Sequence, residues 1–231
     1  MKQYKSVFFD LDHTLWDYDT NSYETLAELY SEHQISEKVG IEFQNFHDSF
    51  QQVNLKLWEQ YDRGFIDREV IRNDRFKMVL SELGNEDHNL AFRLGNHYSI
   101  LSPTKKNLVP NTLEVLNYLL EKYPLYLVTN GFEEMQSTKV ESGGIRKYFK
   151  DVITSERAGH KKPAKEIFDF TLQLGGLDKE EVIMVGDNLL TDIAGASNAG
   201  IDSVLYNPKR ELHQEKVTFE ITSLLELKSI L

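Results

Sequence analysis

The most informative run of residues is Val7-Phe8-Phe9-Asp10-Leu11-Asp12-His13-Thr14-Leu15. An apolar lead-in bounded by polar residues is typical of a buried strand, here residues 5–9. In an extended chain, residues i and i+2 face the same side with Cα atoms about 6.6 Å apart, so Asp10 and Asp12 can flank one small group. Two such carboxylates repel each other unless a metal ion, a proton or another cation lies close by. The pattern favours a chemical site over an acidic turn that merely follows a buried strand.

Length and composition limit the class of protein. A chain of 231 residues is long enough for one large domain or two modest ones. It has no cysteine, which excludes disulfides and thiolate chemistry and fits a reducing compartment. The first residues show neither a signal-peptide pattern nor a membrane span. We therefore expect a soluble, cytoplasmic protein that has no contact with a membrane.

The formal net charge is −11. Such a field repels a nucleic-acid polymer, and no basic stripe in the sequence opposes it. A small anion differs, because a few fixed donors and a divalent cation can bind it despite the net charge. Solubility explains most of the surface acids equally well. The charge thus excludes DNA and RNA as expected partners and leaves small phosphorylated molecules open.

Residues 22–101 have apolar positions spaced three or four apart, as in amphipathic helices. These positions are Tyr23, Leu26, Leu29 and Tyr30, then Phe43, Phe46, Phe50, Val53 and Leu57, then Val70, Ile71, Phe76, Val79, Leu80 and Leu83. No strand pattern interrupts them, and Asp62-Arg63-Gly64 indicates a turn between two helices. The aromatic residues fit a helical core better than a ligand site. We expect residues 17–100 to form an all-helical insert.

After Pro103, short apolar runs alternate with helical stretches. The runs are Leu125–Val128, Val152-Ile153, Val182–Val185 and Ser203–Leu205, and the helical stretches are Thr112–Leu120, Lys165–Leu174 and Thr191–Ala199. This alternation predicts an α/β fold, a doubly wound parallel sheet with helices on both faces. The first strand must join the same sheet, because one strand cannot form a sheet alone. The core is therefore discontinuous, with residues 1–16 and 101–231 in one domain.

Polar residues follow the predicted strands or precede the predicted helices. They are Asp10 and Asp12, then Thr129-Asn130-Gly131, then Lys161-Lys162-Pro163, then Gly186-Asp187-Asn188 with Asp192. In open α/β sheets, ligands bind beyond the carboxyl ends of the strands. These separate segments are therefore expected to meet at one edge of the sheet.

Each segment also has a purely structural interpretation. Asn-Gly is a common turn, Thr191 can cap a helix with Asp192 in its first turn, and Lys162 can be a solvated lysine ahead of Pro163 at a helix start. Together, however, the segments supply carboxylates, a hydroxyl, main-chain donors and a lysine. That combination fits phosphoryl transfer.

The carboxylates suit a magnesium ion. Mg²⁺ prefers hard oxygen ligands, usually one or two carboxylates with substrate oxygens and water. Asp10 and Asp187 are the candidate carboxylate ligands, and the main-chain carbonyl of Asp12 is a candidate third. The cation would offset the repulsion between Asp10 and a phosphate dianion.

The remaining polar residues suit the phosphate itself. Thr129 and main-chain N–H groups near Asn130 are expected to bind phosphate oxygens. Lys162 is expected to bind there too and to stabilise the nucleophile and the charge of the transferring group.

The motifs Asp10-x-Asp12-x-Thr14, Thr129-Asn130, Lys162-Pro163 and Gly186-Asp187-x-x-x-x-Asp192 resemble those of the haloacid dehalogenase-like hydrolase superfamily. The resemblance covers nearly the whole chain: a Rossmann-like catalytic core, with the helical insert in the place of that superfamily's cap. It implies that Asp10 is the nucleophile and forms an aspartyl-phosphate. It implies that Asp12 protonates the leaving alkoxide and then activates water. Asp192 would support a metal ligand or a metal-bound water.

Three other functions compete with a phosphatase. A haloalkanoate dehalogenase of the same superfamily needs no acid for its leaving group and generally lacks the second aspartate, so Asp12 argues against it. A phosphosugar mutase uses both aspartates and stays open. A non-catalytic binding protein is expected to have lost Asp10, Asp12, Lys162 or Asp187, and all four are present.

The substrate is suggested by a further resemblance. Asp17-Tyr18, the stretch Leu57–Gly64, Arg72 and Arg75-Phe76 are similar to the branch of the superfamily that dephosphorylates pyrimidine nucleoside monophosphates. The implied enzyme is a Mg²⁺-dependent nucleotidase, working as a monomer or homodimer on a small phosphorylated metabolite, first of all a nucleotide. Trp58 or Tyr61 can stack on a base, although helix packing explains both.

Two residues depart from the family pattern. His13 stands where an acidic residue is expected, and Asn111 stands where glycine often follows Pro110. Neither change removes a catalytic group.

Overall fold

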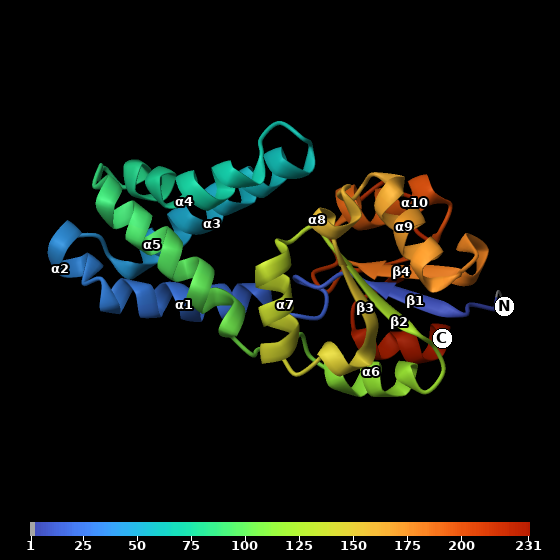
Figure 1. Cartoon of the computed structure of the whole chain (residues 1–231). Helices are drawn as coiled ribbons and strands as arrows, with labels where there is room; N and C mark the ends of the chain where they lie inside the picture. Colours follow the sequence, from blue (N-terminus) through green and yellow to red (C-terminus); the bar gives the residue numbers. More distant parts are fainter. Residues whose placement is uncertain (1–2) are drawn as a thin grey trace. The chain divides into compact units, whose positions relative to one another are not determined.

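The computed structural model describes residues 3–231, and its centre is a six-stranded parallel sheet of order β3-β2-β1-β4-β5-β6 (Figure 1). The strands are β1 (Ser6–Phe9), β2 (Leu125–Thr129), β3 (Phe149–Thr154), β4 (Val182–Gly186), β5 (Asp202–Tyr206) and β6 (Phe219–Ile221). The predicted α/β class and parallel sheet are confirmed. β6 was not predicted, because three residues at a sheet edge, two of them exposed, leave no periodic pattern.

Helices cover both faces of the sheet (Figure 1). One apolar cluster joins Phe8 and Val128 to the helices α9 (Lys165–Gly175) and α10 (Ala194–Ala199). Another joins Val7 and Phe9 to the helices α6 (Thr112–Leu120) and α11 (Leu227–Ile230). Neighbouring residues of β1 thus face opposite layers and are all buried. A parallel strand buried on both faces is an uninterrupted apolar run, which is why Val7-Phe8-Phe9 was recognisable in the sequence.

The helices of this unit are α6 (Thr112–Leu120), α7 (Glu133–Ser142), α8 (Ser155–Ala158), α9 (Lys165–Gly175), α10 (Ala194–Ala199) and α11 (Leu227–Ile230). The helix expected over 191–199 begins as a π-helical turn, Leu189–Ile193, before α10. Its cap is Asn188, whose side chain accepts from the N–H groups of Leu190 and Thr191, so the capping role considered for Thr191 is wrong. Pro163 lies before Ala164, the N-cap of α9, rather than in the helix.

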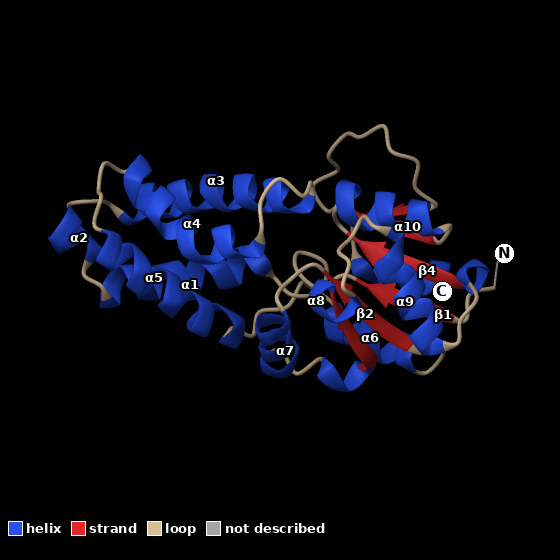
Figure 2. Ribbon diagram, turned by 45° about the horizontal axis from the view of Figure 1, so that its top comes forward, coloured by secondary structure: helices blue, strands red, loops and turns tan. Residues whose placement is uncertain are grey.

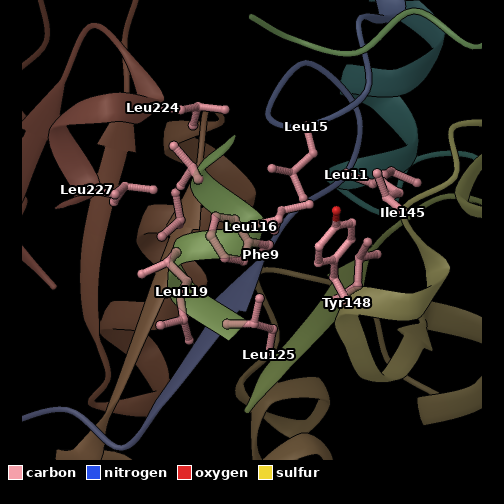
Figure 3. Packing of buried hydrophobic residues seen from close by; sticks show 14 of the residues in the cluster. Phe9, Leu11, Leu15, Leu116, Leu119, Leu125, Ile145, Tyr148, Leu224 and Leu227 are labelled. Carbon is pink, nitrogen blue, oxygen red and sulfur yellow. The ribbon is translucent and has the colours of Figure 1, made fainter. Parts of the chain in front are cut away.

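Phe9 lies at the centre of the larger apolar cluster (Figure 3). Leu116 and Leu119 of α6 belong to the same cluster, as do Leu224 and Leu227 near the C-terminus. This packing fixes the end of β1, and the two aspartates follow directly.

Residues 19–105 form a second compact unit, separate from residues 3–18 and 106–231. Its helices are α1 (Tyr18–Glu32), α2 (Ile35–Val39), α3 (Phe43–Asp62), α4 (Arg68–Glu82) and α5 (His88–Leu101). All of residues 19–105 are described, and no strand occurs among them (Figure 2). The turn expected at Asp62-Arg63-Gly64 separates α3 from α4. No helix within residues 3–231 has the length and apolar composition needed to cross a bilayer.

The aromatic residues of this helical unit mostly form its core, as predicted. Phe46, Phe50, Phe76 and Tyr98 are buried and contact one another through their rings. Tyr23, Phe65 and Phe92 are exceptions, because 48%, 74% and 66% of them are exposed.

The two departures from the family pattern occupy left-handed backbone. His13 has φ 63° and Asn111 has φ 69°. Asparagine, aspartate and histidine enter this region more readily than other side chains, although less readily than glycine. Asn111 therefore supplies the conformation for which glycine is usually selected. His13 can also adopt its left-handed conformation.

The packing of Phe9 leads to a stability prediction. Phe9→Ala leaves a cavity between β1 and α6 and should lower the free energy of unfolding by about 3–5 kcal/mol in urea denaturation. The matched control is Leu212→Ala, because Leu212 is fully exposed. Its effect should stay within about 0.5 kcal/mol. Equal losses from the two variants would contradict the packing assigned to Phe9.

Candidate active site

Three neighbouring strands bring the predicted residues together. Asp10 follows β1, Thr129 ends β2, and Asp187 follows β4, and these strands are adjacent in the order β2-β1-β4. The main-chain N–H of Asp10 donates to the carbonyl of Val185 at 2.9 Å, so β1 and β4 stay paired up to the aspartate. Parallel strands end at one edge of the sheet, and this is the edge where the site was expected.

Lys162 is a buried cation rather than a solvated lysine, with only 1% of it exposed. Its Nζ donates to Asp10 Oδ1 at 2.6 Å, to Asp192 Oδ1 at 2.6 Å and to the carbonyl of Val128 at 2.8 Å. All three ammonium protons are therefore used. The lysine ties the segments after β1 and β4 to the end of β2.

Asn130 positions Lys162 through its side chain. Its Nδ2 donates to the carbonyl of Lys162 at 2.9 Å, and its Oδ1 accepts from the N–H of Lys162 at 2.8 Å. Because the Asn130 side chain is used in this way, only main-chain N–H groups near Asn130 are left to bind phosphate, and that contact stays a prediction. The sequence contained no signal for this pairing, since the two residues are 32 positions apart.

Asp187 and Asp192 have different surroundings. Asp187 Oδ1 accepts from Thr14 Oγ1 at 2.8 Å. Both oxygens of Asp192 are engaged, Oδ1 by Lys162 and Oδ2 by the N–H of Asn188 at 3.0 Å. A Cβ on Gly186 would lie 2.3 Å from Asp192 Oδ2, so glycine is required for this approach. Asp192 thus holds both the lysine and the turn that carries Asp187.

The acids form one group that could hold a cation. Carboxylate oxygens of Asp10, Asp187 and Asp192 lie within 4.8 Å of one another. Among residues 3–231, no hydrogen bond reaches the second oxygen of Asp10. A set of hard carboxylate oxygens fits Mg²⁺. Asp12 lies outside this group, and its predicted contribution through the main-chain carbonyl stays a prediction.

Burial changes the acidity of two of these groups. It raises the pKa of Asp10 well above its usual range; Lys162 opposes this, while Asp192 and Asp187 add to it. Burial, with the neighbouring Asp192 carboxylate, also raises the pKa of Asp187 to about 7, although the Thr14 hydrogen bond opposes the rise. Burial alone would lower the pKa of Lys162, but the two partner carboxylates raise it, so the ammonium stays charged. One ammonium cannot balance three carboxylates, and a divalent cation would restore the ionised forms.

Asp12 is bound by residues that the sequence did not single out. Gln136 Nε2 donates to its Oδ2 at 2.9 Å, and Lys139 Nζ lies 2.5 Å from its Oδ1. Burial raises the pKa of Asp12, but the Lys139 charge and the hydrogen bonds from Lys139 and Gln136 outweigh it and hold the pKa below its ordinary value. Both donors lie on α7, three residues apart, a spacing that places them on one helix face.

The comparisons with known proteins identify the family of this chain. A family model described as haloacid dehalogenase-like hydrolase matches residues 4–200. The chain belongs to this hydrolase family, as its motifs predicted.

Two relatives whose names state an activity match over almost their whole length. Pyrimidine 5'-nucleotidase PynA of Streptococcus pneumoniae is 32% identical and covers 97% of this chain and 93% of the relative. Pyrimidine 5'-nucleotidase YjjG of Escherichia coli is 31% identical, and the match covers 97% of this chain and 96% of the relative.

Solved structures show the same fold. The HAD-hydrolase YfnB from Bacillus subtilis, a structure described as bound to magnesium, superposes with a TM-score of 0.90 at 28% identity and covers 99% of both chains. A 2-haloacid dehalogenase from Pseudomonas syringae has a TM-score of 0.67 at 22% identity, and the match covers 99% of this chain and 98% of that structure. This similarity shows the fold alone.

The burial of Lys162 leads to a second stability prediction. Lys162→Met leaves Asp10 and Asp192 without their cation and should cost about 3–5 kcal/mol of unfolding free energy in urea denaturation at neutral pH without divalent cations. The matched control is Lys165→Met, three residues later, where the ion pair with Asp169 is exposed on both sides. That change should cost less than about 1 kcal/mol. A Lys162→Met protein as stable as the control would refute the role of the buried lysine.

Proposed function

We propose that this hydrolase is a Mg²⁺-dependent phosphomonoesterase that works through an aspartyl-phosphate on Asp10. Its first candidate substrates are nucleoside 5′-monophosphates with pyrimidine bases. The observation that carries the proposal is the convergence of Asp10, Asp187 and Asp192 around Lys162. The similarity to PynA and YjjG, both named pyrimidine 5'-nucleotidases, supports the choice of substrate.

In the first step, the second oxygen of Asp10 attacks phosphorus and the bond from phosphorus to the ester oxygen breaks. Lys162 keeps the other oxygen of Asp10 fixed at 2.6 Å, which orients the nucleophile. Asp12, ionised in the free protein because Lys139 and Gln136 hold its pKa low, takes up a proton as the phosphate dianion binds beside it and gives that proton to the departing alkoxide. The products are an aspartyl-phosphate on Asp10, an alcohol and ionised Asp12.

In the second step, water attacks the phosphorus of the aspartyl-phosphate and Asp12 accepts its proton. The bond from phosphorus to Asp10 breaks, which regenerates both carboxyl groups and releases inorganic phosphate. Thr129 and main-chain N–H groups near Asn130 bind the phosphate oxygens in both steps, and Lys162 stabilises their charge.

Asp10, Asp187 and the main-chain carbonyl of Asp12 would hold Mg²⁺, with Asp192 supporting Asp187 from the adjacent turn. When bound, the ion offsets the repulsion between the carboxylates and the phosphate dianion. The all-helical unit serves as the cap that selects the leaving group.

The role of Asp12 also separates this proposal from a dehalogenase. Halide leaves carbon without a proton, so a dehalogenase has no use for an acid at this position. Asp12 is nevertheless held by two buried donors, Gln136 and Lys139. This use of Asp12 favours a phosphatase over a dehalogenase.

The activity itself gives the third prediction. Phosphate release from a panel of phosphate esters should require Mg²⁺ and stop in EDTA, with pyrimidine nucleoside 5′-monophosphates among the better substrates. Asp10→Asn should lower kcat by about 10³-fold or more, because the nucleophile is lost. The matched control Asp169→Asn, an exposed aspartate of α9, should keep full activity. Unchanged turnover in EDTA would refute the metal role, and full turnover by Asp10→Asn would refute the nucleophile.

The acidity of Asp187 gives a fourth prediction, which does not depend on turnover. Its folded pKa of about 7 lies above its ordinary value of 3.8, so between these pH values the folded protein binds the extra proton. Without metal, stability should therefore fall as the pH rises through this window. Mg²⁺ displaces the proton, so it should raise the melting temperature more at about pH 8 than at about pH 6. Asp187→Asn should lose this difference, and a larger Mg²⁺ effect at the lower pH would contradict the assignment.

A further inference from the structure

Helix α7 (Glu133–Ser142) directs two buried side chains at Asp12, although none of its residues belongs to a recognised motif. Gln136 is fully buried and Lys139 is 5% exposed. Both lie in the same compact unit as Asp12. Burying an amide or an ammonium costs free energy unless the group is hydrogen-bonded or paired with a charge. The partners of Gln136 and Lys139 are therefore informative.

Lys139 has a single carboxylate partner within residues 3–231, Asp12, at 2.5 Å. Its Nζ also lies 4.5 Å from the centre of the Trp16 ring and 5.8 Å from that of Tyr18. The rings enclose the ammonium and leave the carboxylate as its anionic partner. The salt bridge fixes one oxygen of Asp12 relative to the sheet.

Gln136 fixes the other oxygen and at the same time reaches the end of β2. Its Nε2 donates to Asp12 Oδ2 at 2.9 Å and to Thr129 Oγ1 at 2.7 Å. The carboxylate can only accept, so the amide nitrogen must face it. The amide oxygen is left buried without a hydrogen-bond partner among residues 3–231. An unsatisfied acceptor of this kind costs stability, and the two hydrogen bonds from the amide nitrogen offset that cost only in this orientation.

Gly131 allows this approach. A Cβ at this residue would lie 2.2 Å from Gln136 Nε2. The glycine after Thr129 and Asn130 is therefore needed for space rather than only for a turn.

The same contacts determine which way the Thr129 hydroxyl points. Its oxygen accepts from the N–H of Gly131 at 3.1 Å as well as from Gln136. A hydroxyl has two acceptor sites and one proton to donate. With both acceptor sites filled, the proton of Thr129 is the part that remains for an incoming oxygen anion.

We propose that Gln136 and Lys139 are positioning residues, which hold Asp12 for proton transfer and set Thr129 as a hydrogen-bond donor to phosphate. This inference rests on the proposed phosphatase function and adds two residues to it. Lys139 acts through Asp12 alone, whereas Gln136 acts through both Asp12 and Thr129. The two variants should therefore fail in different ways.

The test compares Lys139→Met and Gln136→Leu on two substrates that differ in the leaving group. A nucleoside monophosphate releases an alkoxide that needs a proton, whereas p-nitrophenyl phosphate releases a phenolate that does not. The quantity compared is kcat/KM, since it reports the steps up to release of the leaving group. For Lys139→Met we expect a loss of about 10²-fold on the nucleotide and a loss of less than about fivefold on the aryl ester.

Gln136→Leu should show the same dependence on the leaving group and should also bind inorganic phosphate about tenfold more weakly as an inhibitor. Lys139→Met should leave this inhibition constant within about twofold. The matched control is Lys150→Met, an exposed lysine of β3, which should change none of these values. Equal losses on both substrates, with the melting temperature unchanged, would refute the positioning role while leaving the phosphatase proposal intact.

A structural readout keeps the inference testable without activity. If the wild-type protein hydrolyses neither ester, the function proposed above fails. The positioning of Asp12 and Thr129 by Gln136 and Lys139 is then judged from crystal structures of both variants. Asp12 should leave its position in each, and Thr129 should turn only in Gln136→Leu. Unmoved side chains in both would overturn the inference.

Discussion

The arrangement of the site depends on one buried ammonium. Lys162 lies between Asp10 and Asp192 at 2.6 Å from each, and it also binds the end of β2 through Val128. Three segments that are distant in sequence are joined at this one atom. A buried charge is tolerated only when it is paired and fully hydrogen-bonded, and Lys162 meets both conditions. Because one positive charge cannot neutralise the surrounding carboxylates, the same constraint makes a divalent cation a good fit to the remaining acids.

The supporting residues explain several choices in the chain. Gly186 gives Asp192 room, and Gly131 gives Gln136 room. Asn130 locks the main chain of Lys162 with two hydrogen bonds. These residues surround the reacting groups without being the reacting groups, and they restrict where a carboxylate or an ammonium can lie. Preorganisation of this kind is a large part of how enzymes lower barriers.

Two residues that depart from the family pattern fit the backbone conformation at their positions. Asn111 adopts a left-handed conformation and substitutes for glycine. His13 also adopts a left-handed conformation, at a position where an acidic residue is expected. In the helical unit, Trp58 and Tyr61 pack edge to face at 5.6 Å. Arg75, which is buried, donates to Asn54 and lies over the ring of Tyr98. Packing therefore accounts for these contacts, and selection of a base by Trp58 or Tyr61 stays a prediction.

The sequence by itself determined the class of fold and the chemistry at the strand ends. Uninterrupted apolar runs such as Val7-Phe8-Phe9 are typical of buried strands in a covered parallel sheet, and the edge of such a sheet gathers Asp10, Thr129 and Asp187. Short or weakly periodic features were missed: β6, the π-helical turn before α10 and its cap Asn188. Only the tertiary structure decided which donors face which carboxylates. Lys162, Gln136 and Lys139 reach across 152, 124 and 127 positions to their aspartates, and no local pattern encodes contacts of that range.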